Sequence, residues 1–149
     1  MMILCVGAYA QTTFILVRHA EKGTDDPKNP ALSTEGQARA KSLSKLLEKQ
    51  KIDAIYSTNY HRTRNTVAPV AEAKGITIET YDALKLDELI TKHNGGTVLI
   101  CGHSNTVPGF ANTLLGGNQF ANYDDADYGN VLIITATAVG HGTVTHLRY

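Results

Sequence analysis

An apolar run that ends in two cationic side chains is the feature that most constrains this chain. Residues 14–22 read FILVRHAEK, so four apolar residues lead directly into Arg18 and His19. A run of this length fits a strand buried on both faces of a parallel sheet, and such sheets bind ligands beyond the carboxyl ends of their strands. A guanidinium presents a planar fork of donors to phosphate oxygens, and an imidazole serves as nucleophile or proton carrier near neutral pH. The run therefore predicts a phosphate-handling site, with a structural histidine that caps a carbonyl as the alternative.

A second strand of the same design supports the functional interpretation. Residues 97–103 read TVLICGH, an apolar strand followed by a glycine that allows close backbone approach and then by His103. A helix is expected over residues 107–115, with Pro108 in its first turn, where the missing N–H group costs nothing. The first N–H groups of that helix would face the same place, and anions bind readily at helix N-termini. Two histidines are thus expected at equivalent strand ends.

A third segment adds positive charge. Residues 52–56 predict a short strand, Ser57, Thr58 and Asn59 are typical capping residues, and residues 60–74 predict a helix. Its first turns carry His61, Arg62 and Arg64, where the helix dipole disfavours cations by a few tenths to about 1 kcal/mol each. We expect Arg62 to reach the site beside Arg18, and His61 and Arg64 to be solvated.

Four segments together give a specific resemblance. Residues 16–21, 32–38, 56–66 and 102–105 occur in the order in which the histidine phosphatase superfamily, also called phosphoglycerate-mutase-like, carries its motifs. Ala20 stands where the family's Arg-His-Gly signature usually has glycine. The short segment between Arg62 and His103 leaves no room for the cap of mutases and larger phosphatases. In size the chain resembles the small bacterial phosphohistidine phosphatases, and its site is expected to be open.

The resemblance implies a role for each matching residue. His19 would be the nucleophile that forms a phosphohistidine, later hydrolysed by water without a metal or cofactor. Arg18, Arg62 and His103 would line the phosphate pocket, and Ser104 would lend a backbone N–H. The neutral His19 needs an acceptor for its second ring nitrogen, for which a backbone carbonyl is expected. The implied substrate is a small phosphorylated molecule or a phosphoprotein, bearing a phosphomonoester or a phosphoramidate.

The acid that would protonate the leaving group is not identified by the sequence. Residues 81–88 offer no clean match to the acidic residue of the family, and a carboxylate at the start of the helix predicted over residues 88–93 is more often a cap. The candidates are Glu21, Asp87, Glu88, Asp124, Asp125 and Asp127. This gap leaves open a phosphate-binding or signalling module with little turnover. A metal-dependent hydrolase using His19, His103, Asp124 and Asp125 is a weaker alternative, because metal ligands rarely have arginines beside them.

The order of predicted elements favours a three-layer α/β sandwich. Strands alternate with helices, which indicates a mostly parallel central sheet with helices on both faces. A helix is expected over residues 35–50, opened by a capping box of Thr34 and Gln37. Residues 131–135 and 143–147 predict an antiparallel edge hairpin around the turn at His141. The 149-residue length fits one catalytic domain over residues 11–149.

Composition and the first ten residues bear on partners and location. Lysine and arginine total 14, as do aspartate and glutamate, so no net basic charge indicates nucleic acid. Residues 1–10 are apolar, end in Ala-Tyr-Ala and are too short to span a membrane, which is typical of the end of a signal peptide and predicts export to the periplasm or beyond. They lack a basic n-region, so a start placed too far downstream or an apolar strand are alternatives. Without them, Cys101 is the one cysteine, and it lies in a predicted buried strand.

Overall fold

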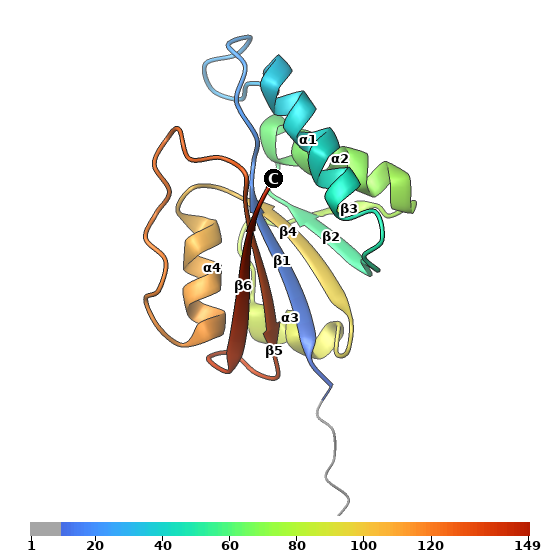
Figure 1. The fold of residues 1–149 in the computed structure, drawn as a ribbon, viewed down its shortest axis with the longest axis vertical. Helices are drawn as coiled ribbons and strands as arrows, with labels where there is room; N and C mark the ends of the chain where they lie inside the picture. Colours follow the sequence, from blue (N-terminus) through green and yellow to red (C-terminus); the bar gives the residue numbers. More distant parts are fainter. Residues whose placement is uncertain (1–9) are drawn as a thin grey trace, which may run out of the picture.

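A six-stranded sheet with helices on both faces forms the protein (Figure 1). The computed structural model describes residues 10–149; the segment predicted as a signal peptide therefore lies almost wholly outside the described residues. The strands lie in the order β3-β2-β4-β1-β5-β6, with β1 to β4 parallel and β5 antiparallel to both neighbours. This confirms the predicted sandwich. The elements are β1 (Thr12–Arg18), α1 (Thr34–Leu46), β2 (Ala54–Ser57), α2 (His61–Lys74), β3 (Ile78–Thr80), α3 (Leu86–Lys92), β4 (Thr97–Gly102), α4 (Thr106–Leu115), β5 (Asn130–Ala136) and β6 (Gly142–Arg148).

The register of the central strands decides where the two histidines emerge. β1 pairs with β4 in parallel, with Arg18 opposite Gly102. The next residue of each strand is therefore a histidine at the same edge of the sheet, and the His19 N–H donates to the Gly102 carbonyl at 3.0 Å. β5 pairs on the other side of β1, which leaves the apolar run of β1 buried. The pairing of buried strands thus places His19 beside His103, 84 positions apart in sequence.

Each face of the sheet has its own apolar core. α1 and α2 cover one face, where their apolar side chains pack against Ile15 and Val17, and α3 and α4 cover the other, against Phe14 and Leu16 (Figure 1). Alternate residues of β1 therefore serve opposite cores, as expected for a strand buried on both sides. No helix in residues 10–149 has the length and apolar character that crossing a membrane requires.

The N-terminus of α1 is capped differently from the prediction. Ser33, rather than Thr34, is the N-cap, and its hydroxyl accepts the Gly36 N–H at 3.1 Å. The capping box predicted from Thr34 and Gln37 was therefore wrong by one residue. Glycine is required at the third helical position, because a side chain there would overlap the backbone carbonyl of Glu21. The start of α1 is thereby packed against the segment that follows His19. The helix also ends at Leu46, four residues earlier than expected.

The N-terminus of α2 is capped from another part of the chain. None of the three residues expected to cap it does so, and the N-cap residue Tyr60 makes no side-chain capping bond. Instead, the side-chain oxygen of Asn29 accepts the His61 N–H at 2.9 Å. A cap from the loop of residues 22–32 has no signal in the local sequence.

Candidate active site

Two imidazole rings meet at the carboxyl edge of the sheet. The ring centroids of His19 and His103 lie 5.5 Å apart in an edge-to-face arrangement. His19 is only 4% exposed. His103 is half-buried in the turn between β4 and α4. The structure therefore brings together the two side chains on which the sequence analysis depended.

His19 is held as a neutral imidazole of one tautomer. Its Nδ1 lies 2.8 Å from the Ala20 carbonyl oxygen, so Nδ1–H donates and Nε2 keeps its lone pair. The Ala20 N–H in turn donates to the buried Oγ1 of Thr66 at 2.8 Å. Burial, and then the positive charges of Arg18 and Arg62, lower the pKa of His19 to about 3. At neutral pH the side chain is therefore an uncharged imidazole of fixed orientation, with the Nε2 lone pair that a nucleophile requires.

His103 is also uncharged at neutral pH. Its Nε2 lies 3.0 Å from the Thr58 hydroxyl oxygen, and that hydroxyl donates to Thr63, so Nε2–H is the donor to Thr58. The backbone N–H of His103 donates to Thr106, the first residue of α4. Burial, followed by the charges of Arg62 and Arg18, lowers the pKa of His103 to about 4. The negative charge of an anion bound beside His103 would offset the positive charges of Arg62 and Arg18 and would therefore raise the pKa of His103.

Arg18 is buried and fixed by backbone oxygens. Its Nη1 donates to the carbonyls of Asp124 and Asp127, each at 2.8 Å, and its Nη2 donates to the carbonyl of Asp125 at 3.3 Å. Its guanidinium carbon also lies 4.3 Å from the centroid of the Tyr128 ring. The Nε–H is buried without a hydrogen-bond partner. The loop before β5 therefore engages both terminal nitrogens of the fork that was expected to face phosphate, and the Nε–H and one Nη2–H are left to the site.

Arg62 approaches from the start of α2. Its guanidinium carbon lies 4.3 Å from the centroid of the Tyr60 ring, and its Nε–H is also buried without a partner. Its charge lowers the pKa of both imidazoles. Arg64, two residues on, instead donates to the Thr80 hydroxyl at 2.7 Å, and His61 is exposed. Arg62 is thus the cation of this helix that reaches the histidines.

Ser104 lies half-buried after His103, and its carbonyl accepts the Tyr123 N–H at 2.9 Å. This bond ties the loop before β5 to the start of α4. Tyr123 itself is partly buried, which raises the pKa of its hydroxyl to about 12. The backbone of Ser104 therefore serves as an attachment point for the loop that also holds Arg18.

The candidate acids are engaged elsewhere or exposed. Arg39 binds both carboxylate oxygens of Glu21 at 2.6 to 2.9 Å and holds the pKa of that carboxyl below its usual range. The Asp127 carboxylate accepts from Asn130 and Arg148. The remaining candidates are the exposed residues Asp87, Glu88, Asp124 and Asp125. Within residues 10–149 no hydrogen bond or ion pair joins a carboxylate to either imidazole, and no three His, Cys, Asp or Glu side chains gather as metal ligands.

Four residues around the histidines were not assigned to the site from the sequence. Thr66 lies four residues after Arg62, one helical turn on, so its spacing was a usable signal. Tyr60 precedes Arg62 by two residues, and Thr58 follows the end of β2. Tyr128 lies in an irregular loop, and no periodicity could have indicated it.

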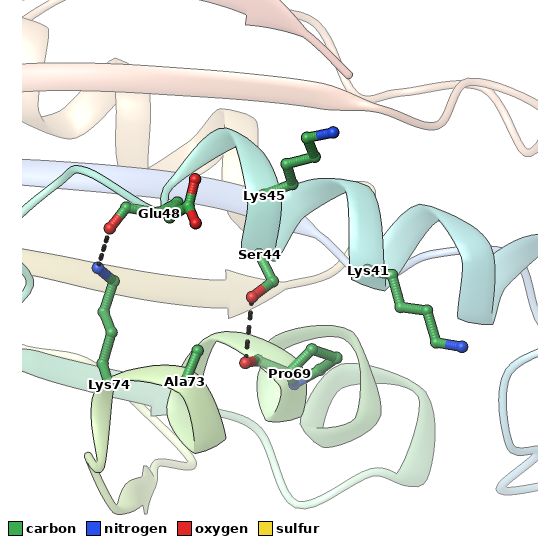
Figure 2. Close-up of a pocket in the computed structure, with 7 residues that line it drawn as sticks. All are labelled: Lys41, Ser44, Lys45, Glu48, Pro69, Ala73 and Lys74. Atoms are coloured by element: carbon green, nitrogen blue, oxygen red, sulfur yellow. Dashed lines mark hydrogen bonds between the residues drawn. The ribbon is translucent and has the colours of Figure 1, made fainter.

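A separate cavity of about 480 Å³ lies between α1 and α2, away from the histidines. Figure 2 shows that the Lys45 side chain points away from α2, whereas the Ser44 hydroxyl donates to the Pro69 carbonyl at 3.1 Å. Lys74 donates to the carbonyl of Glu48 at 3.2 Å, also joining the two helices (Figure 2). These contacts stabilise the helix pair behind the site.

Comparison with known proteins identifies the family. Residues 14–86 match the family model described as the histidine phosphatase superfamily (branch 1). Phosphoserine phosphatase 1 of Hydrogenobacter thermophilus is 34% identical over 87 residues, which cover 54% of this chain and 39% of that protein. The match thus spans well under half the length of that relative.

Solved structures show the same fold at low identity. The protein histidine phosphatase SixA complexed with tungstate superposes with a TM-score of 0.76 at 16% identity, over 91% of this chain and 96% of that one. A putative phosphohistidine phosphatase SixA from Agrobacterium tumefaciens gives a TM-score of 0.72 at 19% identity, over 93% and 98%. Sequence match, fold and the order of the motifs agree: this chain belongs to the histidine phosphatase superfamily.

Proposed function

We propose that this protein is a metal-independent phosphatase that acts through a phosphohistidine on His19. The observation that carries the proposal is the surroundings of Nε2 of His19. A neutral imidazole with its lone pair on that nitrogen lies close enough to Arg18 and Arg62 for their charges to lower its pKa, and each arginine has a buried Nε–H without a partner. Buried donors are almost always satisfied, so two unpartnered ones beside a nucleophile favour an anionic ligand there.

The proposed reaction has two balanced steps. In the first, the Nε2 lone pair of His19 forms a bond to phosphorus while the bond from phosphorus to the leaving oxygen or nitrogen breaks, and the leaving group departs with that electron pair and takes a proton. In the second, water attacks the phosphoryl group, the P–N bond breaks, and its electron pair returns to Nε2. Phosphate is released, and the proton of the attacking water passes to solvent. The Nδ1 bond to Ala20 fixes the ring throughout.

The arginines and His103 would stabilise the charge that spreads over the transferring group. Phosphoryl transfer asks mainly for positioning and electrostatic stabilisation. Arg18 is rigid because three backbone carbonyls hold it, and Arg62 is fixed against a tyrosine ring. Ser104 would lend its backbone N–H to the same oxyanion. One of the superposed structures is a protein histidine phosphatase complexed with tungstate, so a protein of this fold binds an oxyanion that resembles phosphate.

A phosphate-binding module with little turnover is the second candidate. The observation that favours it is that Glu21, two residues after His19, and Asp127, whose carbonyl holds Arg18, are both bound by arginines. A metal-dependent hydrolase is disfavoured because Arg18 is bound to the backbone carbonyls of Asp124 and Asp125, and its fixed positive charge near these residues would repel a metal cation.

Trapping the intermediate tests the proposal. The protein is mixed with an aryl phosphate and quenched in alkali, and we expect phosphate on the peptide containing His19 that is stable to alkali and labile to acid. His19→Ala should abolish both labelling and turnover, whereas His141→Ala, in the exposed β5–β6 turn, controls for loss of an imidazole. Turnover should persist in a chelator. Phosphate release that continues in His19→Ala would refute the nucleophile, and binding of phosphate without release from any substrate would favour the binding module.

A further inference from the structure

We propose that Tyr60 and Tyr128 form an aromatic clamp that selects phosphoryl groups attached directly to a planar aromatic ring. The inference rests on the proposed phosphatase function and specifies its substrate class. In this proposal the two tyrosines recognise the leaving group, whereas the arginines and histidines bind the phosphoryl group.

The two tyrosines extend a row of rings that begins with the histidines. The Tyr128 ring centroid lies 6.2 Å from that of His19, His19 lies 5.5 Å from His103, and His103 lies 5.3 Å from Tyr60. Each tyrosine thus contacts one imidazole, from a different segment of the chain: Tyr60 precedes α2, and Tyr128 lies in the loop before β5. A phosphoryl group bound at the two imidazoles would therefore have a tyrosine ring near each of them.

Both rings are held in place by the arginines of the site. Arg18 stacks on Tyr128 and Arg62 on Tyr60, each with the guanidinium carbon 4.3 Å from the ring centroid. Such stacking fixes the rings before a substrate arrives, so little freedom is lost on binding. Tyr60 remains 42% exposed. An exposed aromatic residue beside His103 offers apolar contact to the part of a ligand that extends out of the phosphate pocket.

The absence of a nearby acid supports the same substrate class independently. In residues 10–149 no carboxylate is hydrogen-bonded to either histidine, which favours substrates whose leaving group needs little acid assistance. An aryl oxide is a far better leaving group than an alkoxide, because the ring delocalises the electron pair that it takes from phosphorus. It then acquires its proton from solvent. Ring stacking and leaving-group chemistry therefore select the same compounds.

Binding of two phosphonates tests the clamp without requiring turnover. Affinities of phenylphosphonate and methylphosphonate are measured by calorimetry, and the wild-type protein is expected to prefer the phenyl compound. Tyr60→Leu and Tyr128→Leu should each reduce that preference about two- to twelvefold, the worth of one aromatic contact. Tyr60→Phe and Tyr128→Phe are the matched controls, since they keep the ring and should keep most of the preference. Thermal unfolding of each variant verifies that it is folded. Because Tyr60 is exposed, Tyr60→Leu should disturb folding less than Tyr128→Leu does.

The outcomes separate the clamp from the phosphatase proposal. Equal affinities in the wild type, a preference that survives both Leu variants, or an equal loss in the Phe and Leu variants would each overturn the clamp. A phenyl preference lost in the Leu variants, with no phosphate released from phenyl phosphate, would uphold the clamp and refute the phosphatase. If neither phosphonate binds, the clamp is overturned. With turnover present, the same variants should lower kcat/KM for phenyl phosphate more than for ethyl phosphate.

Discussion

Acid should destabilise this protein through the buried His19, by an amount that follows from its surroundings. The pKa of His19 falls from 6.5 to about 3 on folding, chiefly because the side chain is buried. The unfolded chain therefore binds a proton at His19 more readily than the folded chain does between these values. The stabilising contribution of the neutral ring is present above pH 6.5 and is lost as the pH falls toward 3. Between pH 6 and pH 4 this loss is about 2 to 3 kcal/mol.

The assay is urea unfolding of the wild type and His19→Asn at pH 6, 5 and 4. Asparagine keeps a donor for the Ala20 carbonyl but has no titrating ring. The free energy of unfolding should fall by about 2 to 3 kcal/mol more in the wild type than in the variant over this range. Carboxylates whose pKa is lowered by ion pairing, such as Glu21, also lose stabilisation in acid, but they do so in both proteins and cancel in the difference. His141→Asn controls for removal of an exposed histidine. A wild type and variant with the same pH dependence would refute the burial of a neutral imidazole.

Three further substitutions test separate parts of the site. Arg62→Ala should raise KM and lower kcat together, so that kcat/KM falls by about tenfold or more. Arg64→Ala should change both constants far less, and steady-state kinetics with an aryl phosphate compare the two variants. A larger effect of Arg64→Ala would show that Arg64, and not Arg62, is the arginine of the site. Thr66→Val removes the acceptor of the buried Ala20 N–H and should cost about 1–3 kcal/mol in urea unfolding, with slower phosphohistidine formation; unchanged stability and rate would contradict this. Gly36→Ala, which would overlap a backbone carbonyl, should cost at least about 1 kcal/mol, and a higher melting temperature would show that this contact relaxes easily.

The sequence predicted the parts of the site that follow directly from buried strands. The apolar runs of β1 and β4 could be read from their pattern, and parallel pairing of two such strands brings His19 and His103 to one edge. Arg62 could be chosen over Arg64 because it lies nearer to the strand end. These predictions depend on local pattern and on sheet topology, and both are strongly specified by burial.

What the sequence did not predict depends on contacts between distant loops. The Asn29 cap of α2, the tyrosine in the loop before β5 and the carbonyls that hold Arg18 come from segments without hydrophobic periodicity. The short strand β3 was not singled out, since Ile78–Thr80 is only three residues and mostly exposed. The start of α1 was misassigned by one residue because Ser33 and Thr34 are adjacent and either residue type can cap a helix.

The manner in which Arg18 is held has a consequence for how this protein tolerates sequence change. Its partners at positions 124, 125 and 127 are main-chain oxygens, which every amino acid provides. Exchanging the exposed side chains at 124 and 125 should therefore leave the guanidinium in place. Adding or deleting one residue would displace all three oxygens together. The number of residues in this loop is therefore more tightly constrained than their identities. We expect homologues to substitute residues in the loop freely while keeping its length.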